Sequence, residues 1–273
     1  MKNFFLSATL LALLPLLFAC NKSDVNTDEP QFAAHAGKLV LKDATVKSDT
    51  PAPGTIVSIE LSESGLYVVG RATAGTDLDY STGTYTVQGK IYSLQGFGTL
   101  EFDNGKAGDV SVKITTPGGG AQTVSATFRK ATESNPLYRT WTIEKTRVNI
   151  HAWVNASADF PGCNFYDIAK FARDSGHDAP SDLAPDFAVK SLTFTGTNTV
   201  FLVYTDNTLD LCEFSLSGNT VSYSWDHDKV KFTFVSSKAQ VEYVDGKCLL
   251  SVDTKIQNST TSVSVTFVLT PLN

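Results

Sequence analysis

The chain has 273 residues, of which 42% are hydrophobic, and it carries a formal net charge of −6 at pH 7. That negative charge argues against nucleic acid as a partner, because nucleic acids are bound through basic patches. The length suits one large β domain or two small ones. Serine, threonine, valine and aromatic residues are abundant, which favours β-strands.

The N-terminal segment has the three-part pattern of a secretion signal. Lys2 supplies a positive charge, Phe4–Phe18 is mostly apolar, and Ala19 is a small residue at the expected cleavage site. The apolar stretch is too short to span a bilayer comfortably, and Pro15 breaks its last turn. We therefore predict a signal peptide over residues 1–19.

Leu17-Phe18-Ala19-Cys20 resembles the lipobox of bacterial lipoproteins. The resemblance implies cleavage before Cys20 and attachment of lipid to its thiol, with several acyl chains holding the protein at the membrane. Residues 20–36 then form the lipidated cysteine and a polar, flexible tether. We expect an outer-membrane lipoprotein on the cell surface or the periplasmic face. An ordinary signal peptide followed by an incidental cysteine is the alternative.

From residue 37 onward, apolar residues alternate with polar ones, which is typical of strands with one buried face. Glycine, asparagine and aspartate interrupt the pattern at short spacing, as in antiparallel hairpins. The clearest alternating runs are residues 57–61, 110–114, 124–128, 230–234 and 263–269.

Two halves of the chain resemble each other at three places, in the same order. The matched segments are 39–46 with 141–148, 85–89 with 214–218, and 124–128 with 263–267. Matches in one order favour a tandem duplication. The boundary falls in the polar stretch before Pro136, so we predict one β domain over 37–131 and a second over 137–273.

Residues 137–143 resemble the first strand of lipocalin-like domains, in which Gly-x-Trp opens the barrel, although Arg139 stands where the glycine would be. The first repeat keeps that glycine as Gly37. Residues 64–67 and 83–85 are similar to turn-and-strand motifs of Bacteroidetes-type lipocalin-like lipoproteins. The resemblance implies an all-β fold with two tandem, small, antiparallel lipocalin-like barrels.

The second repeat carries a long insertion, residues 149–187, where the first repeat needs only residues 47–54. Long connections in compact domains usually have a role. Residues 163–172 have helical spacing that places Phe165, Ile168 and Ala172 on one face. We expect the insertion 149–187 to be a lid over the open end of the second barrel, or a plug that completes its core.

The three cysteines other than Cys20 allow at most one disulfide. Cys212 and Cys248 alternate with apolar residues, so both point into a barrel from strands several places apart. Strands spaced about 4.8 Å apart hold them beyond disulfide reach. We predict that these two are not joined and that any disulfide uses Cys163.

Few residues suggest chemistry. Asp226-His227-Asp228 occupies a hairpin position, where a solvated turn is the ordinary interpretation. His151, Cys163 and His177 lie in the insertion but have no catalytic motif around them. Gly118–Gly120 lacks the lysine and hydroxyl residue of a phosphate-binding loop. We therefore predict no catalytic residue, metal site or cofactor.

Two functions remain open. The favoured one is a membrane-anchored module that binds a small hydrophobic ligand, a glycan or another envelope protein, with Trp141, Trp153, Phe165 and Ile168 as candidate ligand contacts. The other is a hydrolase-like envelope enzyme with its site in the insertion. Aromatic side chains more often fill a small barrel than line a pocket, so a filled core is expected before a cavity.

Overall fold

The computed structural model describes residues 32, 34–42, 53–74, 78–103, 107–131, 135–152, 155–177, 181, 183–224, 238–255 and 262–272. All belong to the compact unit Phe32–Asn273. The predicted signal peptide, Cys20, Trp153 and Asp226-His227-Asp228 lie outside the described residues. Within the described ranges, no helix is long and apolar enough to cross a membrane.

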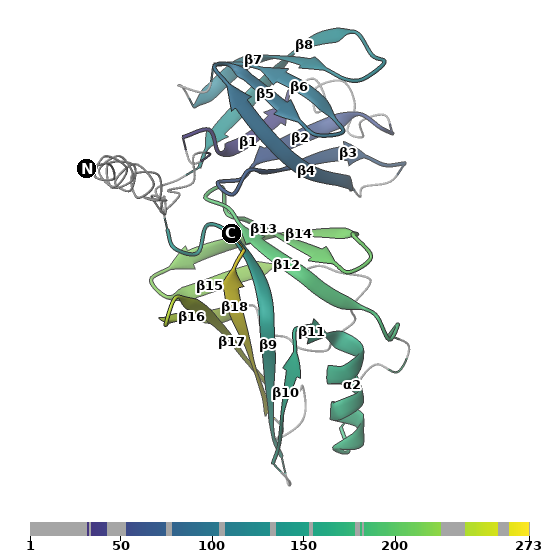
Figure 1. Cartoon of the computed structure of the whole chain (residues 1–273), viewed down its shortest axis with the longest axis vertical. Coiled ribbons are helices and arrows are strands. Elements are labelled where there is room, and N and C mark those ends of the chain that lie inside the picture. Colours follow the sequence, from purple (N-terminus) through teal and green to yellow (C-terminus); the bar gives the residue numbers. More distant parts are fainter. Residues whose placement is uncertain are drawn as a thin grey trace, which may run out of the picture. The chain divides into compact units, whose positions relative to one another are not determined.

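The first barrel consists of eight antiparallel strands that pair in chain order and close through β1 and β8 (Figure 1). They are β1 (Gly37–Leu41), β2 (Ile56–Leu61), β3 (Leu66–Ala72), β4 (Leu78–Gln88), β5 (Ile91–Leu94), β6 (Gly98–Glu101), β7 (Gly108–Thr115) and β8 (Ala121–Lys130). Successive side chains of a strand point to opposite faces, so the apolar residues of each alternating run face the barrel interior, as the sequence predicts.

Aromatic side chains fill the first barrel. Tyr92 stacks on Phe102 with ring centroids 4.7 Å apart, and Phe102 meets Phe128 edge-on at 5.3 Å. Tyr67 and Tyr85 are buried in the same cluster. Here the expectation of a filled core is met.

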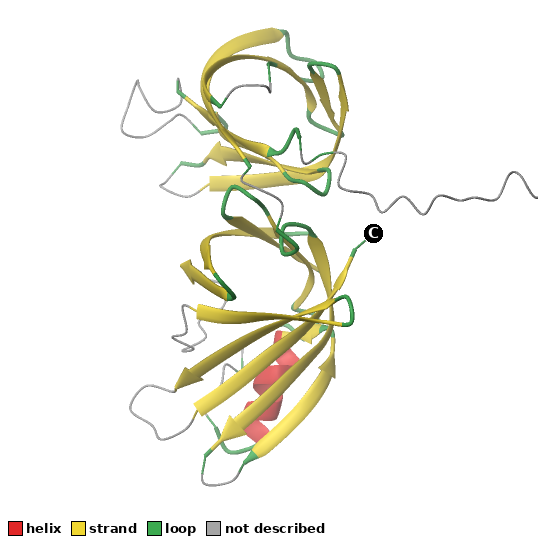
Figure 2. Cartoon of the chain, turned by 90° about the vertical axis from the view of Figure 1, so that its left-hand side faces the viewer, coloured by secondary structure: helices red, strands yellow, loops and turns green. Residues whose placement is uncertain are grey.

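The second barrel also has eight antiparallel strands, and it closes because β9 pairs with both β18 and β12 (Figure 2). They are β9 (Thr140–His151), β12 (Ala188–Phe194), β13 (Thr199–Tyr204), β14 (Leu209–Ser217), β15 (Thr220–Ser224), β16 (Lys238–Val244), β17 (Lys247–Lys255) and β18 (Ser262–Pro271). The predicted fold of two tandem antiparallel barrels is confirmed.

The insertion is more regular than a loop. β10 (Ala156–Pro161) pairs with β9, and β11 (Cys163–Asn164) pairs with β12. The helix α2 (Phe165–Asp174) follows and lies beside β10 and β11 (Figure 1). Residues 149–151 belong to β9, so the insertion proper begins after the predicted start.

Local sequence explains both ends of α2. The Asn164 side chain accepts hydrogen bonds from the backbone N–H groups of Tyr166 and Asp167, at 2.9 and 3.3 Å. Such an N-cap satisfies donors that the first helical turn leaves unpaired. At the other end Gly176 adopts φ +82°, and the His177 N–H bonds back to the Ala172 carbonyl. The predicted helix is confirmed.

The matched segments fall on equivalent strands of the two barrels: β1 with β9, β4 with β14, and β8 with β18. The third match is out of register, however. Aligning the barrels at the hairpins that follow β4 and β14 makes Leu250 of β17 equivalent to Val112 of β7. Val124 lies opposite Val112, whereas the residue opposite Leu250 is Phe267 and not Val263. Separate folding of 37–131 and 137–273 stays a prediction.

No disulfide joins Cys163, Cys212 and Cys248, and all three are buried. Cys212 lies on β14 and Cys248 on β17, with β15 and β16 between them. The prediction that these two cysteines are not bonded is confirmed, because the strand order keeps them apart.

Candidate ligand site

The second barrel contains an apolar cavity of about 120 Å³ that is partly open to solvent. Every strand of the barrel contributes interior side chains, and the insertion adds two more. The lining residues are Ile143, Cys163, Phe165, Val189, Leu192, Phe194, Val200, Leu202, Cys212, Phe214, Val221, Tyr223, Ala239, Leu250, Val252 and Phe267. The lining carries no charge, so the cavity suits small apolar groups.

The two barrels can be compared strand by strand at one hairpin. Gly89 begins the turn between β4 and β5, and Gly218 begins the turn between β14 and β15. Both glycines have positive φ, at 62° and 57°. A two-residue hairpin fixes the register of its strands. The residues on either side of the turn are therefore structural equivalents.

From this hairpin a row of interior residues crosses β5, β6 and β7 in the first barrel, where Tyr92 pairs with Leu100 and Leu100 with Ile114. In the second barrel Val221 pairs with Ala239, and the register of Gln240 with Ser251 places Val252 next in the row. Each residue in this row has a smaller side chain in the second barrel than in the first. Val221 is equivalent to Tyr92, Ala239 to Leu100, and Val252 to Ile114. All three smaller residues line the cavity. The second barrel is therefore hollow where the first is filled.

Helix α2 is packed on the core of the second barrel. Ile168 and Ala169 are buried, and Phe165 reaches the cavity. Phe171 meets Phe160 of β10 edge-on, with ring centroids 5.8 Å apart. The apolar face of the helix thus finds its partner in the barrel, as expected from its spacing.

The four residues predicted to contact a ligand lie in different places in the structure. Phe165 lines the cavity, and Ile168 packs in the surrounding core without lining it. Trp141 is 2% exposed, and its Nε1–H donates to the Leu137 carbonyl at 2.9 Å. A buried indole needs such an acceptor, and Trp141 is not among the residues that line the cavity. Trp153 lies outside the described residues.

Sequence reasoning missed the small residues that create the cavity, above all Val221 and Ala239. The matched hairpin contained the necessary signal, since it aligns Val221 with Tyr92. Ala239 could not be aligned without the register of β16, because the connection before it is long.

Access is indicated by the lining side chains that keep some exposure, namely Phe165, Tyr223, Val252 and Phe267. The Tyr223 hydroxyl is the one hydroxyl among the residues that line this cavity. Burial raises the pKa of Tyr223, so the phenol is neutral at physiological pH. A ligand would meet hydrocarbon, thiols and this single hydroxyl.

The insertion does not present a thiol nucleophile. Burial raises the pKa of Cys163 to about 12, although a hydrogen bond with Thr146 opposes this shift. A protonated, buried thiol is inert. His151 is exposed on β9, and within the described ranges no hydrogen bond connects Cys163 with His151 or His177. No metal-binding group of three or more His, Cys, Asp or Glu residues occurs there either.

No protein-family model matches the sequence, and no curated protein matches it. Among solved structures, a double mutant of the vaccine antigen Transferrin Binding Protein B from Haemophilus parasuis Hp5 is similar at 8% identity and a TM-score of 0.25, covering 78% of this chain and 53% of that chain. Intact Ap-TbpB, with N and C lobes, matches at 10% identity and a TM-score of 0.25, covering 78% and 54%. The chain spans about half the length of these structures, and likeness this weak carries no conclusion about function.

Proposed function

We propose that this chain is a lipid-anchored envelope lipoprotein whose second barrel binds a small, uncharged, apolar ligand. The observation that carries the proposal is the cavity, which arises from a row of small interior residues in a barrel whose counterpart is filled. The lipobox-like sequence ending at Cys20 supports the anchor and an outer-membrane location, of the Bacteroidetes lipocalin-like type.

The lining decides the chemistry of the ligand. A charged group inside the cavity would lose its hydration without gaining a partner, which is costly. A glycan is disfavoured for a similar reason, since its hydroxyls would find one phenol and no carboxylate or amide. The part of the ligand that enters the cavity is therefore a hydrocarbon or aromatic group.

Size sets the expected affinity. Burying about 150 Å² of apolar ligand surface at ~25 cal/mol per Å² contributes about 4 kcal/mol. That corresponds to a Kd near 1 mM. A benzene-sized molecule should therefore bind weakly, and a natural ligand needs further contacts beside Phe165 or Tyr223, at the partly exposed rim.

The other parts of the chain take supporting roles in this proposal. The first domain, 37–131, has a filled core and holds the second away from the membrane. Helix α2 acts as the lid of the second domain, 137–273. Another envelope protein as partner stays a prediction from the sequence.

Binding of an apolar fluorescent probe or of benzene tests the proposal. Ala239→Leu introduces the leucine found at the equivalent position of the first barrel, Leu100. Its side chain should fill the cavity and abolish binding. Ala121→Leu makes the same change on the exposed face of β8 and should leave binding intact. If folded Ala239→Leu protein binds the probe as tightly as the wild type, the cavity is not the site.

A further inference from the structure

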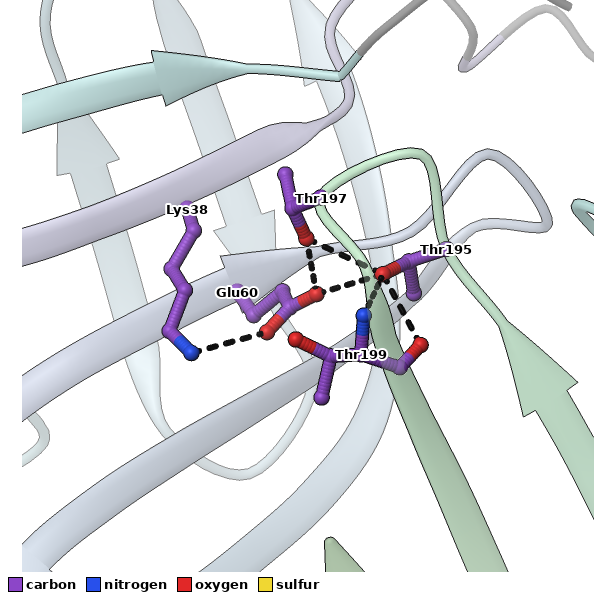
Figure 3. Close-up of polar contacts among 5 residues, drawn as sticks. All are labelled: Lys38, Glu60, Thr195, Thr197 and Thr199. Atoms are coloured by element: carbon purple, nitrogen blue, oxygen red, sulfur yellow. Dashed lines mark hydrogen bonds and ion pairs between the residues drawn. The ribbon is translucent and has the colours of Figure 1, made fainter. Parts of the chain in front are cut away.

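A polar cluster joins the two barrels (Figure 3). The turn between β12 and β13 donates hydrogen bonds to two glutamates of the first barrel. The Thr195 hydroxyl donates to Glu60 Oε1 at 2.7 Å, and the Thr197 hydroxyl donates to the same oxygen. The Gly196 N–H donates to Glu63 Oε1 at 2.8 Å. These contacts connect β2 and the turn after it with the second barrel.

A chain of hydroxyl groups runs alongside. Ser64 Oγ lies 2.9 Å from Thr140 Oγ1, which lies 2.9 Å from Thr193 Oγ1. Ser64 also contacts Ser62 Oγ at 3.0 Å. The described contact between the barrels is thus built on hydrogen bonds, whose strength depends on the charge of the acceptors.

The cluster holds more negative charge than its surroundings neutralise. Glu60 is 2% exposed and Glu63 is 5% exposed. The Lys38 ammonium is 3.7 Å from Glu60 Oε2. Glu60 Oε2, Glu63 Oε2 and Thr199 Oγ1 have no hydrogen-bond partner, and Figure 3 shows the Thr199 hydroxyl directed toward the Glu60 carboxylate. One ammonium beside two buried carboxylates leaves a charge whose desolvation is uncompensated.

The other titratable groups around this cluster add no positive charge. Tyr85 donates its hydroxyl to the Ser62 carbonyl at 2.8 Å and lies near Glu63. Tyr80 of β4 lies near Glu60 and near Glu213 of β14, a third carboxylate. Burial raises the pKa of both tyrosines, so both are neutral. Protonation of one glutamate is the remaining way to balance the cluster.

We propose that this cluster is a proton-controlled latch between the two barrels. With a proton on Glu63, the cluster carries one carboxylate and one ammonium, and the turn after β12 stays bonded to the first barrel. When both glutamates are charged, their repulsion and desolvation weaken the contact, and the barrels separate more readily.

The direction of the pH effect follows from the pKa of Glu63. Burial raises it to about 7, the charge on Glu60 adds to the rise, and hydrogen bonds from the backbone N–H groups of Glu63 and Gly196 oppose it. In the open state the carboxyl is solvated and regains its ordinary value of 4.5. The latch is therefore strongest below pH 4.5, weakens about tenfold per pH unit as the pH rises toward 7, and changes no further above it.

Hydrogen exchange of the Gly196 amide measures the latch directly, because that N–H bonds to Glu63 across the junction. With the intrinsic pH dependence of exchange removed, protection in the wild type should fall about a hundredfold between pH 5 and pH 8. Glu63→Gln keeps the acceptor but cannot ionise, so its protection should not depend on pH. Glu101→Gln changes an exposed glutamate of the same barrel and should behave as the wild type.

The proposal is overturned if the Gly196 amide of the wild type is equally protected at both pH values. It is also overturned if protection in Glu63→Gln falls between pH 5 and pH 8 as much as in the wild type. If Glu63→Gln does not fold, a carbon-13 titration of the Glu63 carboxyl in the wild type decides. A pKa near 7 supports the latch, and a value at or below 4.5 overturns it. Neither outcome bears on ligand binding in the second barrel.

Discussion

At the scale of single residues, three interior positions have smaller side chains in the second barrel than in the first, namely Val221, Ala239 and Val252. Leu100 is fully buried between Tyr92 and Ile114, whereas its counterpart Ala239 leaves space in the second barrel. Interiors pack closely, so the loss of a few methylene groups along one row produces a cavity.

Exchanging these residues should have opposite consequences. Leu100→Ala removes packed atoms and should destabilise the protein by roughly 2–5 kcal/mol, because the surroundings collapse only partly. Ala239→Leu enters existing space and should cost little or stabilise. Denaturant unfolding measures both changes. A cost of about 1–3 kcal/mol for Ala239→Leu, typical of overpacking, would show that no usable space exists there.

At the scale of elements, the proposed function makes helix α2 the part of the site that opens. Its N-cap is Asn164, its buried contacts are Ile168 and Ala169, and Phe165 forms part of the cavity wall. A cap and a short apolar face hold it on the barrel with a few kcal/mol, which permits opening without unfolding of the strands.

Loosening α2 distinguishes a lid from a plug. Ile168→Ala should destabilise the protein by roughly 2–4 kcal/mol through the lost packing. For a lid, the barrel stays folded and ligand exchange becomes faster, as measured by relaxation dispersion or stopped flow. Lys170→Ala changes an exposed residue of the same helix and serves as the control. Loss of barrel structure in Ile168→Ala alone would identify α2 as a plug.

Much of the fold was predictable at this scale. Alternating residues mark the barrel strands, and the spacing of Phe165, Ile168 and Ala172 marks the helix. β10 and β11 were not predicted, because β11 has two residues and the burial of β10 depends on its pairing with β9. The cavity was not predicted because the pattern shows which residues face inward, but the volume they enclose depends on the register of neighbouring strands. The inter-barrel cluster depends on contacts between residues more than 130 positions apart.

At the scale of the whole molecule, the proposed function gives the two barrels different roles. They share one topology, but one has an aromatic core and the other a cavity. The tandem duplication predicted from the sequence accounts for this difference, since one copy can keep a stable core while the other loses bulk. In the proposed function, a lipid on Cys20 ties the filled barrel to the membrane.

The anchor itself is open to a direct experiment. Cys20→Ala should leave the chain unprocessed or release it into the soluble fraction, because the acceptor of the lipid is gone. Ser23→Ala, three residues further along the tether, should fractionate with the wild type. Membrane fractionation and mass spectrometry of the N-terminus check both. Normal processing and membrane retention of Cys20→Ala would contradict the lipid anchor.

The measurement that most directly tests ligand binding in the second barrel is methyl NMR of the protein titrated with benzene. Binding in the cavity predicts saturable shifts of the Val221, Ala239 and Val252 methyl signals, with a Kd near 1 mM by the area estimate. The methyl signals of Leu100 and Ile114, at the equivalent positions of the filled barrel, should stay in place. Ligand binding in the cavity would be contradicted if the methyl signals of the second barrel did not shift at several millimolar benzene, or if the signals of both barrels shifted equally.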